Sequence, residues 1–467
     1  MDDRLQAALD AVGSSAGSYA GDLADFVRIP SVSTVPEHRP DVAAAAAWVA
    51  ARLQRAGVPE VRTIDTPGNA VVVGRWQVDA ALPTVVIYGH YDVQPPEPLE
   101  LWQSPAFEPE ERNGRVYGRG AAADKGGVLI AAQAVEAWAR AAGAPPVNVT
   151  FVIEGEEEIG SPNLPTFLRE HRELLVGDLA ISADGGMLGA DQPSLTVGNR
   201  GLAGCQIDVV GAAGDLHSGL YGGAVPNPLE GLARILAAMH DGRGRITVPG
   251  FYDGVKEPSP AVRDAIAALP HDDAAELAAV GLTAWTGEEG YAPLERRWVR
   301  PTFEINGMWG GYQGEGVKTV LPNAAHAKIT CRLVEGQDPD RILDAIEAYV
   351  RELTPEGLEA SIQRLQGKAR AYEMPLDHPS IALASACLQD VYGKEPAFIW
   401  VGGTVPVAAD FRALLGMWTL YFAFGEPDNG IHAPNEFFRI DTIRRGTLAT
   451  ARLLHAIARH ADELKGA

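Results

Sequence analysis

The stretch TVVIYGHYD, residues Thr84–Asp92, joins a short β-branched apolar run to a histidine and an aspartate. Two further runs have the same apolar character, NVTFVI at Asn148–Ile153 and DLAIS at Asp178–Ser182. Helical patterns accompany them: Asp41–Gly57 begins at a capping aspartate and ends at glycine, and Gly126–Gly143 is rich in alanine. Continuous apolar strands that alternate with helices predict an α/β fold, with a mostly parallel sheet covered by helices.

The pattern changes at about Gly198. GCQIDVVG (Gly204–Gly211) and HAKITCRLV (His326–Val334) alternate like half-exposed strands, with a helix expected near Leu229–His240. After about Ser380 the first pattern returns, with a buried strand WTLYFAF and a final helix. We therefore expect one domain interrupted by an α+β insert, with a first segment at 1–197, the insert at 198–380 and a second segment at 381–467.

The composition limits the classes of partner and compartment. Thirty-nine Lys and Arg against 61 Asp and Glu give a formal net charge of −22, which argues against nucleic-acid and membrane binding. The three cysteines are far apart and form no CxxC pair, which disfavours disulfides and a thiolate zinc site. The sequence starts without a signal-peptide pattern and contains no long apolar run, so a cytoplasmic protein is expected.

Potential metal ligands follow several of the predicted strands. His90 follows TVVIY, Glu157 and Glu158 follow NVTFVI, Asp184 follows DLAIS, and His432 lies beyond WTLYFAF. Each alone has a plainer interpretation, because a single histidine is usually a core or surface residue and EGEEE is usually a solvated acidic run. Their repeated position at strand ends favours a shared site with nitrogen and oxygen ligands, suited to zinc or manganese.

Five longer motifs make a family resemblance specific. They are GHYDVQP (Gly89–Pro95), IEGEEEIGS (Ile153–Ser161), DLHSGLYGG (Asp215–Gly223), KTVLPNAAHAKITCRLV (Lys318–Val334) and IHAPNE (Ile431–Glu436). With these motifs the chain resembles the carnosinase-like dipeptidases of the aminoacylase and carboxypeptidase G family, which are two-zinc metallopeptidases. The resemblance implies a homodimeric, exo-acting dipeptidase whose catalytic domain is interrupted by a lid and dimerisation domain. It implies two divalent ions per subunit, with zinc expected first and manganese or cobalt as alternatives, and a dipeptide or other small amide substrate with a free carboxylate.

The same resemblance implies roles for residues of the first and last segments. His90 and Asp184 would hold one metal ion, and Glu158 and His432 would hold the other. Asp92 would orient the His90 ring, and Glu157 would act as the general base that takes a proton from the attacking water.

In the insert, His217 resembles a residue that reaches across the dimer to the developing oxyanion. Thr319 and Arg332 resemble groups that bind the substrate carboxylate. Gly403 and Thr404 resemble part of a second substrate-binding segment, and His378 is a further candidate for the substrate pocket. The plainer alternatives are a surface-loop histidine at 217, a β-branched strand residue at 319, an exposed cation at 332 and turn glycines at 402 and 403.

One position departs from the family pattern. In the run Gly118–Gly126, GRGAAADKG, the place of the aspartate that bridges both metals is taken by Ala123, and Asp124 follows it. We favour a deliberate inactivating substitution, since the other chemical residues are present. The alternatives are a natural protein with one metal or none, and recruitment of Asp124, which is disfavoured because a shift of one residue turns the side chain in a different direction. Each of the first two explanations predicts very low activity.

Two other functions remain open. An N-acyl amino acid amidohydrolase would use the same metals and carboxylate pocket, and a non-catalytic ligand-binding protein would keep the fold alone. Trp400-Val401 stands where relatives often carry Arg-Glu, which affects the expected specificity more than the reaction type.

Overall fold

The computed structural model describes residues 2–464, which form two compact units. The first unit comprises the residues up to Val197, Met374–Ile399 and the residues from Asp410 onward. The second unit comprises Gly198–Glu373 and Trp400–Ala409. The ten-residue segment at 400–409 therefore belongs with the insert, although its neighbours on both sides belong to the first unit.

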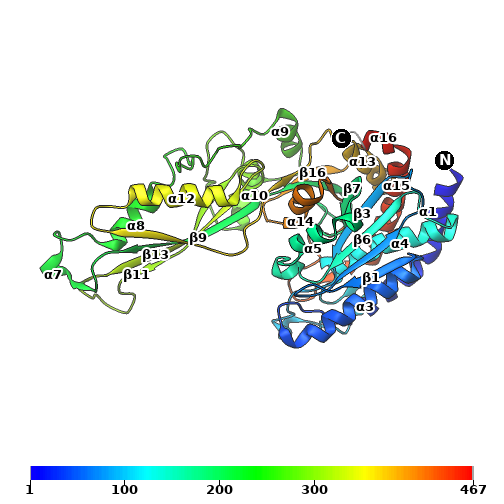
Figure 1. Cartoon of the computed structure of the whole chain (residues 1–467), viewed down its shortest axis with the longest axis horizontal. Coiled ribbons are helices and arrows are strands. Elements are labelled where there is room, and N and C mark those ends of the chain that lie inside the picture. The colour runs from blue at the N-terminus through cyan, green and yellow to red at the C-terminus, as the bar shows by residue number, and fades with distance from the viewer. Residues whose placement is uncertain (1, 465–467) are drawn as a thin grey trace. The chain divides into compact units, whose positions relative to one another are not determined.

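A nine-stranded sheet runs in the order β1-β2-β6-β3-β7-β17-β8-β15, with β16 also paired to β8. The neighbours β6, β3, β7 and β17 are parallel, and the flanking pairs are antiparallel. This architecture confirms the predicted α/β class with a mostly parallel central sheet (Figure 1). The strands are β1 Glu60–Ile64, β2 Val71–Trp76, β3 Thr84–His90, β6 Asn148–Glu154, β7 Leu179–Ser182, β8 Ser194–Asn199, β15 Tyr372–Glu373, β16 Ala397–Val401 and β17 Thr419–Tyr421.

Successive side chains of a strand point to opposite faces of the sheet, and both faces of this sheet are covered by other elements. On β3, the Gly89 Cα faces Val128 of α4 on one side. The Tyr88 ring meets the ring of Phe411 edge-on at 5.8 Å on the other side. The helices of this unit are α1 Asp3–Ser15, α2 Tyr19–Val27, α3 Arg39–Arg55, α4 Gly126–Ala142, α5 Leu164–Glu170, α6 Arg172–Leu175, α13 Pro379–Tyr392, α15 Ile440–Arg459 and α16 Ala461–Leu464, and α14 Pro406–Asp410 ends at the boundary between the units.

A small antiparallel sheet, in the order β18-β5-β4, joins distant parts of the first unit. Its strands are β4 Glu110–Arg112, β5 Arg115–Tyr117 and β18 Phe437–Arg439. Because Phe437 pairs with Tyr117, the residues before β18 lie beside the residues after β5. This pairing brings the IHAPNE motif next to the GRGAAADKG run.

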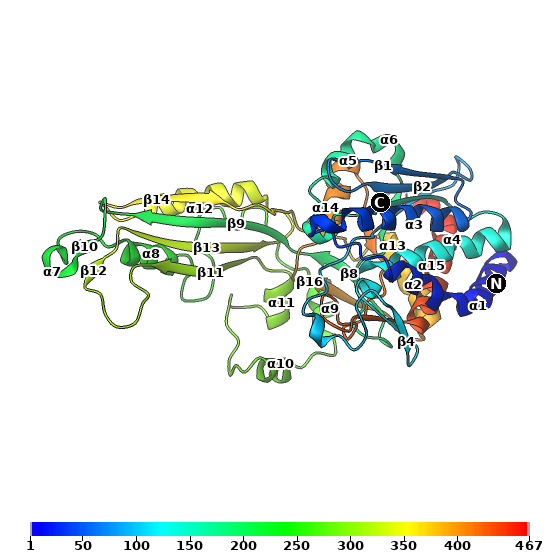
Figure 2. The same cartoon turned by 90° about the horizontal axis from the view of Figure 1, so that it is seen from below.

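The second unit is built on an antiparallel sheet in the order β11-β13-β9-β14 (Figure 2). Helices α8 and α12 pack on this sheet, and both begin at Asx caps, Asn227 and Asp338, whose side chains accept hydrogen bonds from backbone amides. The elements are β9 Gly201–Val210, β10 Leu216–His217, β11 Thr302–Gly310, β12 Val320–Leu321, β13 Ala324–Leu333, β14 Glu359–Arg364, α7 Ser218–Tyr221, α8 Pro228–Ala237, α9 Pro260–Ala267, α10 Asp273–Ala279, α11 Pro293–Trp298 and α12 Pro339–Leu353.

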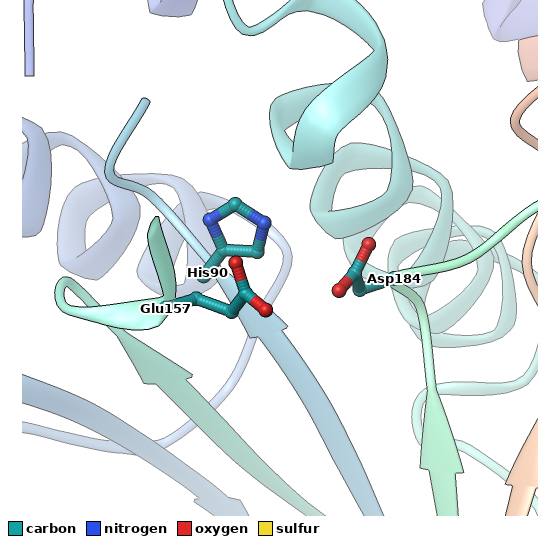
Figure 3. Close-up of side chains that lie close together, drawn as sticks. All are labelled: His90, Glu157 and Asp184. Atoms are coloured by element: carbon teal, nitrogen blue, oxygen red, sulfur yellow. The ribbon is translucent and has the colours of Figure 1, made fainter. Parts of the chain in front are cut away.

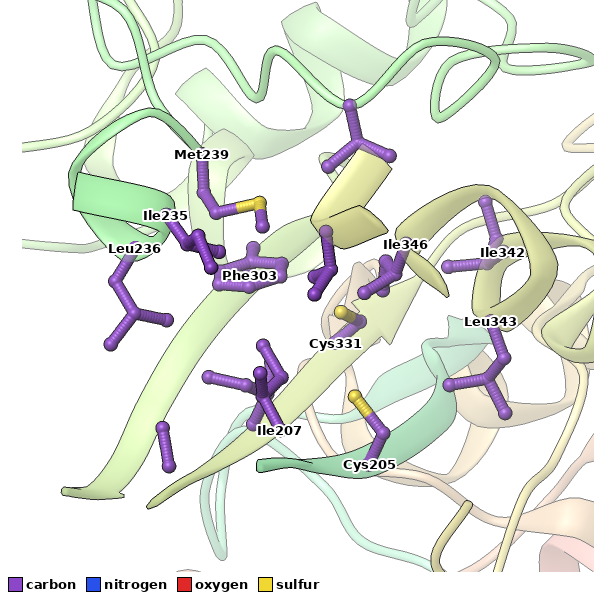
Figure 4. Close-up of a cluster of buried hydrophobic side chains, with 14 of the residues drawn as sticks. Cys205, Ile207, Ile235, Leu236, Met239, Phe303, Cys331, Ile342, Leu343 and Ile346 are labelled. Carbon is purple, nitrogen blue, oxygen red and sulfur yellow. The ribbon is translucent and has the colours of Figure 1, made fainter. Parts of the chain in front are cut away.

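Alternation along the strands explains the core of the second unit. Cys205 and Ile207 of β9 and Cys331 of β13 point to the same buried face, where they meet Ile342 and Ile346 of α12 (Figure 4). The spacing of four residues on α12 places its apolar side chains on one side of the helix. Arg332 of β13, between two buried neighbours, therefore points to the opposite face of the sheet.

Two further features concern the cysteines and the helices. Cys205, Cys331 and Cys387 are each buried and unpaired. Among residues 2–464, none of the helices has the length and apolar character needed to cross a bilayer.

Candidate metal centre

The predicted metal ligands meet at one edge of the central sheet. His90 is the last residue of β3, Glu157 follows β6, Asp184 follows β7, and His432 lies in the loop after β17. The four strands are parallel neighbours, so their carboxyl ends share one edge. The apolar runs are buried in the sheet, and the polar residues begin where the strands end.

Three of these side chains form a compact group (Figure 3). The ligand atoms of His90, Glu157 and Asp184 all lie within 4.8 Å of one another. His90 is 1% exposed, and the three residues border a cavity of about 300 Å³. The same cavity is lined by Ala123, Glu158, Gly185, Gly186, Met187, Gly425, Glu426, Pro427, Ile431 and His432.

Asp92 connects the histidine to the glutamate turn. The His90 Nδ1 lies 3.0 Å from the Asp92 carbonyl oxygen and 3.3 Å from its Oδ1. The backbone amides of Glu157 and Glu158 donate to the Asp92 carboxylate over 3.2 and 3.1 Å, and the Ser33 hydroxyl donates over 2.6 Å. Asp92 is fully buried. One carboxylate therefore orients the imidazole ring and also fixes the turn that carries both glutamates.

Glu158 and His432 form a second pair on the cavity wall. The His432 Nε2 lies 3.1 Å from Glu158 Oε1, and the Gln94 amide donates to Glu158 Oε2 over 2.8 Å. His432 has a φ of 62°, in the left-handed region that non-glycine residues rarely adopt. The loop thus holds this imidazole against Glu158 at some cost in backbone strain.

The electrostatics of the cavity fit a bound cation. Burial, together with the charges of Asp184 and Glu158, raises the pKa of Glu157 to about 8. Burial also raises the pKa of Asp184. Burial lowers the pKa of His90, but its hydrogen bond to Asp92 and the negative charges of Glu157 and Asp184 outweigh this effect and raise it. Clustered carboxylates with imidazole nitrogens are a donor set that suits divalent metal ions, whose charge would relieve this repulsion.

Ala123 borders the cavity, whereas Asp124 does not line it. The Asp124 carboxylate lies against Gly89 and Gly127, where a Cβ atom on either glycine would come within 2.7 and 2.0 Å of its oxygens. Its pKa is raised well above the ordinary value by burial and by the charge of Asp184. This packing gives no support to recruitment of Asp124 as the bridging ligand.

Sequence reasoning missed the role of Glu436, although its motif was recognised. Glu436 is fully buried and accepts hydrogen bonds from the Arg119 guanidinium at 2.7 Å and from the Gly120 amide at 3.0 Å. It also accepts from the amides of Ala122 at 2.8 Å and Ala123 at 3.2 Å. Glu436 therefore holds the loop that carries Ala123. The sequence did contain a signal, namely Arg119 in the GRG run and Glu436 in the PNE run. Two opposite charges that are buried in the same site have to pair.

The residues predicted to bind substrate in the second unit form two groups. In one, the Arg332 guanidinium donates to the Thr404 hydroxyl over 2.8 Å, and the carbonyl of Gly403 accepts from the Arg200 amide. In the other, the exposed His217 precedes α7 and its Nδ1 accepts from the Gly219 amide over 3.0 Å. The carbonyl of Thr319 accepts from the amide of Ser218, which places Thr319 beside this turn.

His378 lies apart from the metal cavity in the first unit. It caps α13, its Nδ1 lies 2.8 Å from the Ser380 hydroxyl, and its ring packs edge-on against Trp418 at 5.7 Å. Burial, followed by the charge of Arg412, lowers its pKa. These contacts account for His378 structurally, and its part in substrate binding stays a prediction.

Comparison with known proteins agrees with the resemblance that the motifs carry. Residues 86–456 match the model of peptidase family M20/M25/M40. A Cys-Gly metallodipeptidase of Schizosaccharomyces pombe is 30% identical over 93% of this chain and 94% of its own length. The human Beta-Ala-His dipeptidase is 28% identical over 89% of this chain and 85% of its own.

A solved structure supports the same relationship. An M20 family metallo-carboxypeptidase from Sulfolobus solfataricus aligns with a TM-score of 0.79 and 29% identity, covering 92% of this chain and 97% of that one. The family match covers well over half of the sequence. The chain belongs to peptidase family M20/M25/M40, a family of metallopeptidases.

Proposed function

We propose that this chain has the scaffold of an exo-acting dipeptidase that uses two divalent metal ions. One observation carries the proposal: His90, Glu157, Glu158, Asp184 and His432 border a single cavity at the carboxyl edge of the parallel strands. Relatives that align over most of the chain are named as dipeptidases. Zinc is the first candidate metal because the ligands are imidazoles and carboxylates, and manganese or cobalt would also accept them.

The residues divide into metal ligands and a proton carrier. His90 and Asp184 would hold one ion, and Glu158 and His432 the other. Bound ions would polarise the scissile carbonyl and favour deprotonation of the attacking water. Glu157 would accept the water proton at its carboxylate and pass it to the leaving amine nitrogen, as its place on the cavity wall allows. Asp92 would keep the His90 ring oriented.

Arg332 would bind the carboxylate at the end of the substrate. A guanidinium matches a carboxylate with two parallel hydrogen bonds, and the Thr404 hydroxyl already fixes one side of the Arg332 side chain. Recognition of a terminal carboxylate would restrict the enzyme to substrates with a free carboxyl end. Gly403 and Thr319 would complete the contacts to the peptide.

We further propose a homodimer in the cytoplasm. Several large apolar side chains of the second unit are exposed, including Leu220 at 76%, Val317 at 92% and Ile305 at 50%. Contact with a second copy of the chain would cover apolar side chains that are exposed to this extent. In such a dimer His217 would reach the developing oxyanion of the partner subunit. The unpaired, buried cysteines agree with a reducing compartment.

Ala123 favours a second candidate, a non-catalytic ligand-binding protein on the same fold. The loop places residue 123 on the cavity wall, where a methyl group contributes no ligand to either metal. Loss of a shared ligand would weaken binding of both ions, so we expect this chain to turn over dipeptides very slowly. An N-acyl amino acid amidohydrolase would use the same groups without binding a free amino terminus.

The experiment compares this chain with its Ala123→Asp variant, each loaded with zinc or manganese, on Ala-Ala and on N-acetyl-alanine. Cleavage of Ala-Ala by the variant alone supports the dipeptidase proposal and the disabling effect of Ala123. Cleavage of N-acetyl-alanine in preference to Ala-Ala supports the amidohydrolase. If neither protein cleaves either compound, the catalytic proposal fails and the ligand-binding role takes its place.

A further inference from the structure

The second unit contains a cavity of about 590 Å³ that has not yet been given a function. It lies on the face of the sheet opposite the apolar core, because Thr330 and Arg332 of β13 and Glu304 of β11 line it. Residues of the segments at 240–246, 286–288 and 296–302 also line it. Its size is within the range of small-molecule sites in proteins.

The wall is rich in arginine although the whole chain has a net charge of −22. Two of the arginines that line the wall are paired with carboxylates. Arg300 is buried and donates from Nε and Nη2 to the Glu288 carboxylate, over 2.8 Å in each case. Arg297 donates to both carboxylate oxygens of Glu276. The charges of Arg297 and Arg300 are therefore largely compensated.

Three other guanidiniums, those of Arg200, Arg296 and Arg332, line the cavity differently. Within residues 2–464, none of them forms an ion pair with a carboxylate. Arg200 Nε donates to the carbonyl of Gly402 over 3.0 Å, Arg296 donates to backbone carbonyls, and Arg332 donates to the Thr404 hydroxyl. Each contact orients the side chain without pairing its positive charge with a carboxylate.

Arg200 and Arg332 also affect one another. Burial, followed by the positive charge of Arg332, lowers the pKa of Arg200 to about 10. Two guanidiniums on one cavity wall repel each other, and an anion placed between them would remove that repulsion. The backbone of Arg200 also donates to the carbonyls of Val401 and Gly403, so the side chain is anchored beside the Gly402–Thr404 loop.

We propose that Arg200 and Arg332 form a binding site for two carboxylates, so that the preferred substrates are dipeptides ending in aspartate or glutamate. This inference rests on the proposed dipeptidase function. Arg332, with Thr404, would bind the terminal carboxylate, and Arg200 would bind the side-chain carboxylate of the same residue. A guanidinium fork suits each carboxylate, and Arg296 adds positive potential on the same wall.

Glu304 is the opposing charge in this cavity. Its side chain is exposed, it forms no ion pair within the described residues, and its charge acts on Arg200. An anionic substrate side chain would be repelled by Glu304 while it is attracted by Arg200. Removing the charge of Arg200 should therefore weaken the preference for an acidic side chain, and removing the charge of Glu304 should strengthen it. A purely structural role for either residue would not produce these opposite changes.

The test measures kcat/KM for Ala-Glu, Ala-Gln and Ala-Ala in the Ala123→Asp background with zinc. Ala-Glu and Ala-Gln differ in charge and hardly in shape. We expect Ala-Glu to be preferred over Ala-Gln by about tenfold, the effect of one hydrogen bond to a charged group. Arg200→Gln should bring this ratio close to one, and Glu304→Gln should raise it. Arg351→Gln, an exposed arginine of α12 paired with Glu347, is the matched control and should leave the ratio unchanged.

The outcomes separate this inference from the proposed function. Cleavage of the dipeptides without preference for Ala-Glu overturns the inference and leaves the dipeptidase intact. An equal loss on both peptides in Arg200→Gln shows that Arg200 only positions the Gly402–Thr404 loop, and also overturns it. If no dipeptide is cleaved, calorimetric binding of Ala-Glu and Ala-Gln to this chain decides: tighter Ala-Glu binding that Arg200→Gln abolishes supports the site, and equal binding refutes it.

Discussion

The backbone amide of Ala123 donates a hydrogen bond to the Oε1 of Glu436 over 3.2 Å, across 313 residues of sequence. Glu436 follows His432 by four residues, so one buried carboxylate ties the loop of a proposed metal ligand to the loop with the alanine. The backbone at position 123 is therefore fixed beside the cavity independently of the side chain it carries.

Replacing Ala123 by aspartate should restore a ligand that both metal ions share. Because the loop is already held by Glu436, we expect zinc affinity to rise by at least about 100-fold, beyond what outer-sphere contacts alone supply. Competition with a chromogenic chelator measures the affinity directly, without activity. Ala123→Asn is the matched control, since it has nearly the same shape but no charge. Equal affinities of the Asp and Asn variants would contradict a bridging role for position 123.

Replacing Glu436 by glutamine should destabilise the first unit. The change leaves the buried Arg119 guanidinium without its anion, and breaking a buried ion pair typically costs about 3–5 kcal/mol. Urea denaturation measures the free energy of unfolding. Glu347→Gln, which breaks only exposed pairs with Arg351 and Arg364, should change it by no more than about 1 kcal/mol. A loss for Glu436→Gln as small as that of the control would show that the ion pair is unimportant.

Replacing Asp410 by asparagine should stabilise the protein at neutral pH. Burial raises the pKa of Asp410 to about 6, with a smaller opposing effect from Arg169. A carboxyl group whose pKa is raised by folding favours the folded state when protonated, and this contribution is lost as the pH rises through about 6. Asparagine resembles the neutral form at every pH.

The urea midpoints of the parent and Asp410→Asn should therefore differ most at pH 7.5, with the variant more stable by about 1–2 kcal/mol. At pH 4 the difference should shrink. Asp10→Asn, at an exposed position of α1, serves as the comparison and should show no such dependence on pH. A difference in stability that grows toward low pH would have the opposite sign and would contradict a raised pKa for the Asp410 carboxyl group.

The sequence indicates the central strands well because each is a continuous apolar run that ends at a polar residue. TVVIY lies within β3 and NVTFVI within β6, and the residues after them lie at the cavity. The antiparallel flank formed by β1 and β2 was not predicted. Strand β1 has exposed and half-exposed residues only, so it lacks the apolar run that indicates a buried strand.

The metal cavity could be anticipated from strand ends, but its supporting contacts could not. Glu436 accepts hydrogen bonds from the backbone amides of Gly120, Ala122 and Ala123. Because almost every residue has such an amide, the sequence does not indicate which amides a carboxylate will bind. The hydrogen bonds from the amides of Glu157 and Glu158 to Asp92 could not be predicted for the same reason. Spacing and residue type predict which side chains meet, whereas backbone donors are located only by the folded chain.

Mixing two inactive variants should restore activity if His217 acts across a dimer. The Nδ1 of His217 accepts from the Gly219 amide, so the neutral ring carries its proton on Nε2 and can donate it to an oxyanion. In the Ala123→Asp background, His217→Ala should lose about 100-fold or more in kcat, as removal of one oxyanion donor does. Glu157→Gln should lose about 100-fold or more because it removes the general base. A mixed dimer contains one site with both groups intact. Activity that appears on mixing and subunit exchange supports this arrangement, and mixtures as inactive as each parent contradict it. Asp92→Asn mixed with Glu157→Gln is the control. Both residues belong to the metal centre within a single subunit, so every site of a mixed dimer carries one of the two changes and no recovery is expected.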